Sequence, residues 1–157
     1  MMDELLQISD NNFWYTIVEK YHNKGGVYKV IAVRNGERRP IERLLSTDKE
    51  GVLYIGNTTS FLNRIVILKK STAPGYISST HEFGTQYKEH PLIQLKFPFD
   101  ELFIDLKPHE NPEEFERREL KKYYEKFGEM PPFNNQQPQL PILTEWSDDI
   151  STASVVG

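Results

Sequence analysis

The chain contains no cysteine, which excludes disulfide bonds, thiolate nucleophiles and thiolate metal sites. This absence fits a reducing compartment, and we expect the protein to be cytoplasmic. No apolar run approaches the roughly 18 residues that suggest a membrane-spanning helix. The chain begins Met-Met-Asp-Glu, without a basic region or an apolar core, so we expect no signal peptide. The four histidines show no zinc-ligand spacing, and zinc is therefore not expected.

The net charge of −4 is unusual for a protein that binds nucleic acid, but the charges are unevenly distributed. Residues 13–96 carry 13 Lys and Arg against 7 Asp and Glu, whereas residues 97–157 carry 6 against 13. The basic excess favours a polyanionic partner for the first of these segments, although solvated charges with acidic tails would give the same count. A chain of 157 residues is long enough for one domain with a real core.

The apolar pattern predicts an α+β fold with a small three-stranded sheet and helices packed on it. Apolar, β-branched segments predict strands at residues 27–33, 52–55 and 102–106. Helix signals predict helices at residues 13–21, after the N-cap Ser60, and from Asn111 to about Phe127. Residues 69–80 are expected to form a loop. Residues 81–99 fit either a bent helix or a strand.

Two short tyrosine motifs lie on the first two predicted strands. Gly26-Val27-Tyr28 opens the first strand, and Tyr54-Ile55-Gly56 ends the second. Arg64 follows on the next helix, eight residues after Gly56, Glu116 lies on the charged helix, and Asn134 follows two prolines. In this order the five elements resemble the GIY-YIG nuclease family, and the resemblance runs from Gly26 to Asn134. The 25 residues between Tyr28 and Tyr54 exceed the spacing of the shortest family members.

The resemblance implies a fold, a reaction and a division of the chain. The fold would be a small three-stranded sheet flanked by helices, and the reaction a metal-dependent hydrolysis of DNA phosphodiester bonds at one Mg²⁺ or Mn²⁺ ion. Residues 1–25 would form an N-terminal helical extension, 26–135 the nuclease-like domain and 136–157 a polar arm or tail. RNA is left open as a substrate, no membrane partner is expected, and a homodimer is one source of specificity.

Each residue of the motif has a chemical part in phosphodiester hydrolysis. Arg64 would grip the phosphate, because a guanidinium fork matches phosphate oxygens. Glu116 would hold the metal, since Mg²⁺ accepts few carboxylates and keeps most of its waters. Glu116 is preferred over Glu119 because Leu120 and Tyr123 follow it at helical spacing on an apolar face. For most acids on this helix, an exposed face of Glu and Lys pairs is an equal explanation.

The identity of the proton acceptor is open at this stage. In the family, tyrosines at the positions of Tyr28 and Tyr54 line the site, and one serves as general base through its phenolate. Two core tyrosines with hydrogen-bonded hydroxyls would explain the same sequence. Lys29 is not expected to assist Tyr28, because successive strand residues point to opposite faces. His81 is a further candidate acceptor, since the position four residues after Arg64 is Leu68, which has no titratable group.

The segment between the tyrosine motifs is polar and basic. Asn35-Gly36 predicts a turn, and residues 40–45 predict one helical turn. We expect Arg38, Arg39 and Arg43 to bind substrate phosphates, although a plain solvated loop explains them equally well. Asn134 is grouped with these substrate-binding residues by position. The resemblance gives it a bracing role through side-chain hydrogen bonds.

Two functions remain in competition on this evidence. The first is a metal-dependent endonuclease. The second is a non-catalytic module for nucleic-acid binding or protein interaction on the same fold, which the net acidity and Leu68 would suit. A third and weaker hypothesis is that the acidic C-terminal segment covers the basic face or binds a protein partner.

Overall fold

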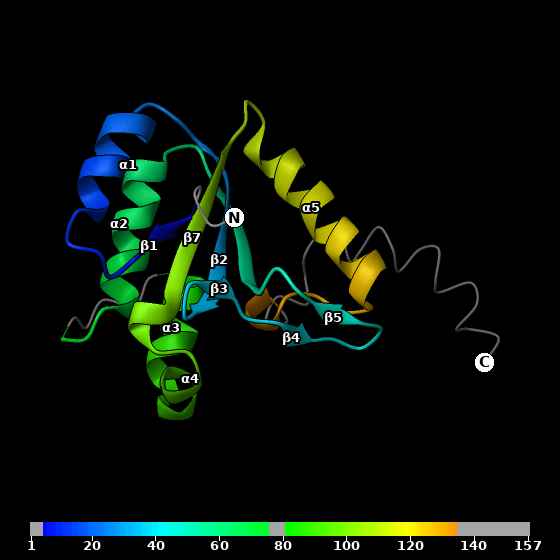
Figure 1. Cartoon of the computed structure of the whole chain (residues 1–157). Coiled ribbons are helices and arrows are strands. Elements are labelled where there is room, and N and C mark those ends of the chain that lie inside the picture. Colours follow the sequence, from blue (N-terminus) through cyan, green and yellow to red (C-terminus); the bar gives the residue numbers. More distant parts are fainter. Residues whose placement is uncertain (1–4, 76–80, 135–157) are drawn as a thin grey trace.

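The computed structural model describes residues 5–75 and 81–134 and has an α+β fold built on an antiparallel sheet (Figure 1). Strand β2 (Gly26–Arg34) lies in the centre, between β6 (Val52–Thr58) and β7 (Leu102–Pro108). Almost every β2 position is apolar and buried, because both faces of this strand are covered. The three predicted strands are confirmed as these three long strands.

Four strands of two residues each were not predicted. β1 (Leu6–Gln7) pairs with β7, and β3 (Glu37–Arg38) pairs with β2, so the sheet has five strands instead of three. β4 (Ile41–Glu42) and β5 (Thr47–Asp48) form a separate hairpin. A strand of two residues is too short to show an alternating pattern, and only its pairing partner identifies it.

Helices cover both faces of the sheet (Figure 1). The face that carries Tyr28 packs against three helices, which are α1 (Phe13–Tyr21), α2 (Phe61–Thr72) and α3 (Glu82–Glu89). The opposite face packs against α5 (Pro112–Phe127), while the short α4 (Pro91–Lys96) follows α3. Within residues 5–75 and 81–134, no helix has both the length and the apolarity to cross a membrane.

The predicted starts of α2 and α5 and the predicted end of α5 are confirmed by their capping contacts. Ser60 Oγ accepts a hydrogen bond from Asn63 N at the start of α2. Asn111 caps α5 in the same way, and Gly128 ends it in the left-handed conformation at φ 79°. Asn35 and Gly36 both have positive φ, as the predicted hairpin turn requires.

Two local predictions are wrong. Residues 40–45 do not form a helical turn, because Ile41 and Glu42 pair with β5 and Leu45 N bonds to Phe127 O at the end of α5. Residues 69–72 continue α2 instead of starting a loop. Ser71 and Thr72 are buried there, and their hydroxyls donate to carbonyls one turn earlier in the helix. Residues 81–99, which the sequence left open, form α3, α4 and a short 3₁₀ turn (Phe99–Glu101).

The first 25 residues share the core of the nuclease-like segment. Ile8, Phe13 and Ile17 are buried in the same apolar cluster as Tyr28. Lys69 Nζ on α2 donates to Ile8 O at 2.6 Å. The tail predicted for residues 136–157 lies outside the described residues.

A buried aspartate ties the start of β6 to α5. Asp48 is 1% exposed, and its two oxygens accept hydrogen bonds from Glu50 N, Val52 N and Tyr123 Oη at 2.9–3.1 Å. Because a buried carboxylate is costly unless it is fully hydrogen-bonded, this set of donors stabilises the entry to β6.

We expect Asp48→Ala to lower the free energy of unfolding by roughly 2–4 kcal/mol, since three donors lose their buried acceptor. Urea denaturation measures the change. Glu50→Ala is the matched control, because the Glu50 side chain is exposed and only its backbone joins this contact. Equal stability of the two variants would show that Asp48 does not anchor β6.

Candidate functional site

The two tyrosine motifs meet through the pairing of β2 with β6. Tyr28 lies directly opposite Gly56, and the ring centroids of Tyr28 and Tyr54 are 6.1 Å apart. A Cβ atom at Gly56 would lie 2.6 Å from Tyr28 Oη and 2.9 Å from Tyr54 Cε2. The glycine therefore leaves the space that the two rings occupy, and a larger residue there would displace them.

His81 is buried, and its ring packs against the rings of both Tyr28 and Tyr54. Its Nε2 lies 2.7 Å from Tyr28 Oη. Its Nδ1 caps α3 by accepting hydrogen bonds from Phe83 N and Gly84 N, so this nitrogen carries no proton. In the neutral ring the proton is then on Nε2, which donates to Tyr28. His81 is therefore placed in the site as expected, but as a donor and helix cap instead of a proton acceptor.

Burial keeps His81 neutral. It lowers the pKa of His81 to about 3, and the positive charge of Arg64 acts in the same direction. The imidazole thus carries no charge at physiological pH, and its hydrogen bond to Tyr28 has a fixed direction.

Arg64 approaches the same oxygen from α2. Its Nε donates to Tyr28 Oη at 3.4 Å, so the tyrosine oxygen accepts from two donors. Within the described ranges, no hydrogen bond or ion pair occupies the terminal guanidinium nitrogens of Arg64. Those nitrogens are therefore available to an external anion.

The two tyrosines differ in their surroundings. Burial raises the pKa of Tyr28 to about 12, while the hydrogen bond and charge of Arg64 oppose that shift. Burial also raises the pKa of Tyr54, and the neighbouring Tyr28 and Glu82 charges raise it further. Only Tyr28 has a cation and a second donor on its oxygen, so Tyr28 is the better candidate for the phenolate form and Tyr54 for a neutral wall of the site.

The sequence preferred Glu116 over Glu119 as the metal ligand, and the structure gives these two glutamates different partners. Glu116 Oε1 accepts a hydrogen bond from Asn57 Nδ2 at 2.8 Å, at the end of β6 next to Gly56. Glu119 instead forms an ion pair with Lys29 at 2.7 Å, beneath the opposite face of β2 from Tyr28. Lys29 thus points away from Tyr28, as the strand alternation predicted.

The surroundings of Glu116 suit a divalent cation. Burial raises its pKa to about 7; the Asn57 hydrogen bond opposes the shift, and the charges of Glu82 and Glu113 add to it. Within the described residues, Oε2 accepts no hydrogen bond and no group of three or more His, Cys, Asp or Glu gathers around a common point. A half-buried carboxylate with one free oxygen and acidic neighbours fits a hard, hydrated ion such as Mg²⁺, which needs few protein ligands.

Asn134 lies at the free edge of β6 and is 3% exposed. Its side-chain oxygen accepts from Ile55 N and its side-chain nitrogen donates to Ile55 O, both at 3.0 Å. The amide therefore takes the place of a neighbouring strand and holds the Tyr54-Ile55-Gly56 segment. This contact is the bracing role that the resemblance gave it, and it uses the polar groups that direct substrate binding would need.

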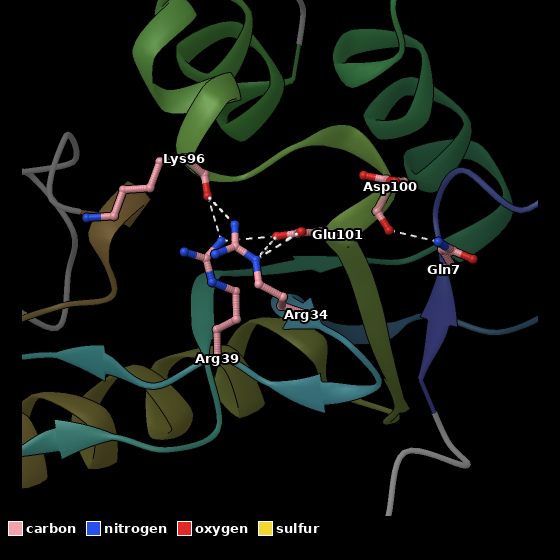
Figure 2. Close-up of polar contacts among 6 residues, drawn as sticks. All are labelled: Gln7, Arg34, Arg39, Lys96, Asp100 and Glu101. Carbon is pink, nitrogen blue, oxygen red and sulfur yellow. Dashed lines mark hydrogen bonds and ion pairs between the residues drawn. The ribbon is translucent and has the colours of Figure 1, made fainter.

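The arginines of the polar segment are engaged with protein acceptors. Arg39 Nη1 donates to Lys96 O and Glu101 Oε1, and Arg34 converges on the same carboxylate, as Figure 2 shows. Arg43 pairs with Glu129 and donates to Met130 O, and Arg38 donates to Glu50 O. The structure thus places Arg38, Arg39 and Arg43 in contacts within the fold, and it brings none of them to Tyr28, Arg64 or Glu116.

Two residues of the site were not predicted. Asn57 holds Glu116, and Glu82 opens α3 with its charge acting on both Tyr54 and Glu116. Strand alternation from Tyr54 would have placed Asn57 on the α5 side of β6. No sequence signal marks Glu82, because the segment that carries it was ambiguous between helix and strand.

Comparison of the chain with models of protein families, with curated proteins and with solved structures returned no match.

Glu116→Gln tests the electrostatics of the site without any metal, in EDTA. The folded-state pKa of about 7 exceeds the ordinary value of 4.5, so the folded protein holds a proton that the unfolded chain has lost. The free energy of unfolding therefore falls as pH rises between these values. We expect the variant to be more stable than the wild type by roughly 1–3 kcal/mol at pH 8, and about equal at pH 4.5.

Urea denaturation at the two pH values measures this difference. Glu125→Gln makes the same chemical change at an exposed position of α5 and should follow the wild type at both pH values. If Glu116→Gln also follows the wild type, the carboxyl is not held in a costly environment.

Proposed function

We propose that this protein is a metal-dependent endonuclease of the GIY-YIG type that hydrolyses DNA phosphodiester bonds. The observation that carries the proposal is the meeting of Arg64 and neutral His81 on the hydroxyl oxygen of Tyr28. Glu116 lies close enough for its charge to raise the pKa of both site tyrosines. A core tyrosine needs one hydrogen-bond partner, and this arrangement supplies two donors together with an unpaired guanidinium end.

The residues divide the work of hydrolysis among them. Tyr28 first loses its hydroxyl proton to solvent. Its phenolate then takes a proton from the attacking water as the water oxygen bonds to phosphorus, the bond from phosphorus to one ester oxygen breaks, and that oxygen takes a proton from solvent. The hydrogen bonds from His81 and Arg64 stabilise the phenolate that accepts the proton. The terminal nitrogens of Arg64 neutralise charge on the phosphate oxygens.

Glu116 is the residue that would hold the cation. A divalent ion bound there would supply positive charge to the phosphate and the leaving oxygen. Asn57 holds one carboxylate oxygen, and the other, which accepts no hydrogen bond within the described residues, would be the ligand.

One observation favours a second function, a non-catalytic module that binds nucleic acid. Burial raises the pKa of Tyr28 to about 12, so its hydroxyl keeps its proton at neutral pH when neither DNA nor a metal ion is bound. A binding module would use Arg64 on a phosphate and would need no proton acceptor. The two functions differ in whether DNA is cut when a divalent ion is present.

We expect wild-type protein to nick supercoiled plasmid in Mg²⁺ or Mn²⁺ and to be inactive in EDTA. Glu116→Gln, Arg64→Ala and Tyr28→Phe should each lower the cleavage rate by roughly 10²-fold or more, because each removes one of the three chemical parts. Single-stranded and branched DNA and RNA belong in the same assay, since the substrate class is part of the proposal.

Glu125→Gln is the matched control on the same helix and should cut at the wild-type rate. Cleavage that survives Glu116→Gln and Arg64→Ala would remove the proposed site. Salt-sensitive binding by wild-type protein without cleavage of any of these substrates would favour the binding module.

A further inference from the structure

A hollow of about 490 Å³ lies beside the C-terminal half of α5, between this helix, β2 and the turn that leads into β6. Its lining includes four lysines, and we call it the lysine hollow after them: Lys29, Lys49, Lys122 and Lys126. Val52, Ile55 and Phe127 form apolar parts of its wall. No residue of the candidate site lines it.

The acids of the lysine hollow are mostly occupied. Of the three, Asp48 is turned toward backbone amides and Tyr123, and Glu119 is held by Lys29 and Lys122. Glu50 is exposed at the rim. Lys49 and Lys126 are exposed too, and neither forms an ion pair with any described residue. The rim therefore presents ammonium groups to solvent that the fold does not neutralise.

The lysine hollow lies on the α5 face of the sheet, opposite the face that carries Tyr28. It is joined to the candidate site along α5, where its lining residue Glu119 lies one turn after Glu116. At 1.5 Å per helical residue, Lys122 and Lys126 lie about 9 Å and 15 Å beyond Glu116 along the helix axis. At about 3.4 Å per nucleotide, these distances span roughly three to four nucleotides of a duplex strand.

The arginines that the sequence suggested for phosphate binding do not offer this surface. Arg39 and Arg43 are engaged in ion pairs and carbonyl contacts, and their side chains are 17% and 9% exposed. Lys122, by contrast, is 75% exposed while contacting Glu119 only at 3.4 Å. Lys49, Lys122 and Lys126 of the lysine hollow are therefore exposed cations that an outside polyanion can reach.

We propose that Lys49, Lys122 and Lys126 bind the phosphate backbone of duplex DNA next to the bond held at Arg64 and Glu116. Lysine suits this part, because an ammonium is a point charge that contacts phosphate without reading sequence. The inference rests on the proposed function for the identity of the polyanion and for the position of the cut bond. It adds a surface that directs one strand along α5.

The test measures DNA binding without cleavage, by fluorescence anisotropy of a labelled 20-base-pair duplex in EDTA over a range of salt concentrations. The variant is Lys49→Ala/Lys126→Ala, which breaks no ion pair among the described residues. The matched control is Lys20→Ala/Lys70→Ala, which removes the same charge from exposed positions on α1 and α2, across the sheet from α5. Thermal melting of both variants checks that they keep the wild-type fold.

We expect the lysine-hollow variant to bind roughly tenfold more weakly near 0.1 M salt. The slope of log affinity against log salt should become shallower by about 1–2, since each lost phosphate contact removes close to 0.9. The control should keep the wild-type slope. An unchanged slope for the lysine-hollow variant, an equal loss in the control, or no DNA binding by wild-type protein would each overturn the inference.

The experiment separates this inference from the proposed function. If wild-type protein binds DNA through Lys49 and Lys126 but never cuts it in Mg²⁺ or Mn²⁺, the DNA-binding surface is supported and the nuclease proposal is refuted. If wild-type protein cuts DNA and the double variant binds DNA as tightly as wild type, the nuclease proposal is supported and the DNA-binding surface is refuted.

Discussion

The pairing of Tyr28 with Gly56 across β2 and β6 is the contact on which the candidate site depends. Backbone hydrogen bonds fix the register, and the missing side chain of Gly56 gives the two tyrosine rings their space. A slip of one residue would turn Tyr28 toward α5 and Lys29 toward α2, because side chains alternate between the faces of a strand. The register therefore places the Tyr28 hydroxyl on His81 and Lys29 on Glu119.

Burial disfavours the charged forms of three groups in the site. His81 is neutral, and the pKa of both Tyr28 and Glu116 is raised mainly by burial. Arg64 brings the fixed positive charge to Tyr28, which it contacts through one nitrogen. Such a site costs little folding stability in its neutral form. Binding is most favourable when a phosphate and a cation enter together, since each compensates the charge of the other.

The sequence predicted the parts of the fold whose signals are local. Ser60 and Asn111 marked helix starts, and three apolar segments marked the long strands. It could not predict β1 or β3, which are defined only by distant partners, nor the part of residues 81–99 that forms α3. The order along the chain suggested Tyr28, Tyr54, Arg64 and Glu116, and His81 was added because Leu68 cannot accept a proton. The structure places His81 and Arg64 in contact with Tyr28. The lysine hollow was missed, because its four lysines come from three separate elements and no spacing links them.

The outer edge of β6 is held in place by hydrogen bonds without being covered by another strand. β6 pairs with β2 on one side only, and on the other side Asn134 satisfies the backbone of Ile55. A full neighbouring strand would hold β6 equally well, but it would bury the edge at which Asn57 meets Glu116. A single buried amide supplies two hydrogen bonds without covering that edge. The segment that reaches this edge, Pro132–Asn134, follows α5, so the bracing residue lies 79 positions after the strand residue that it holds.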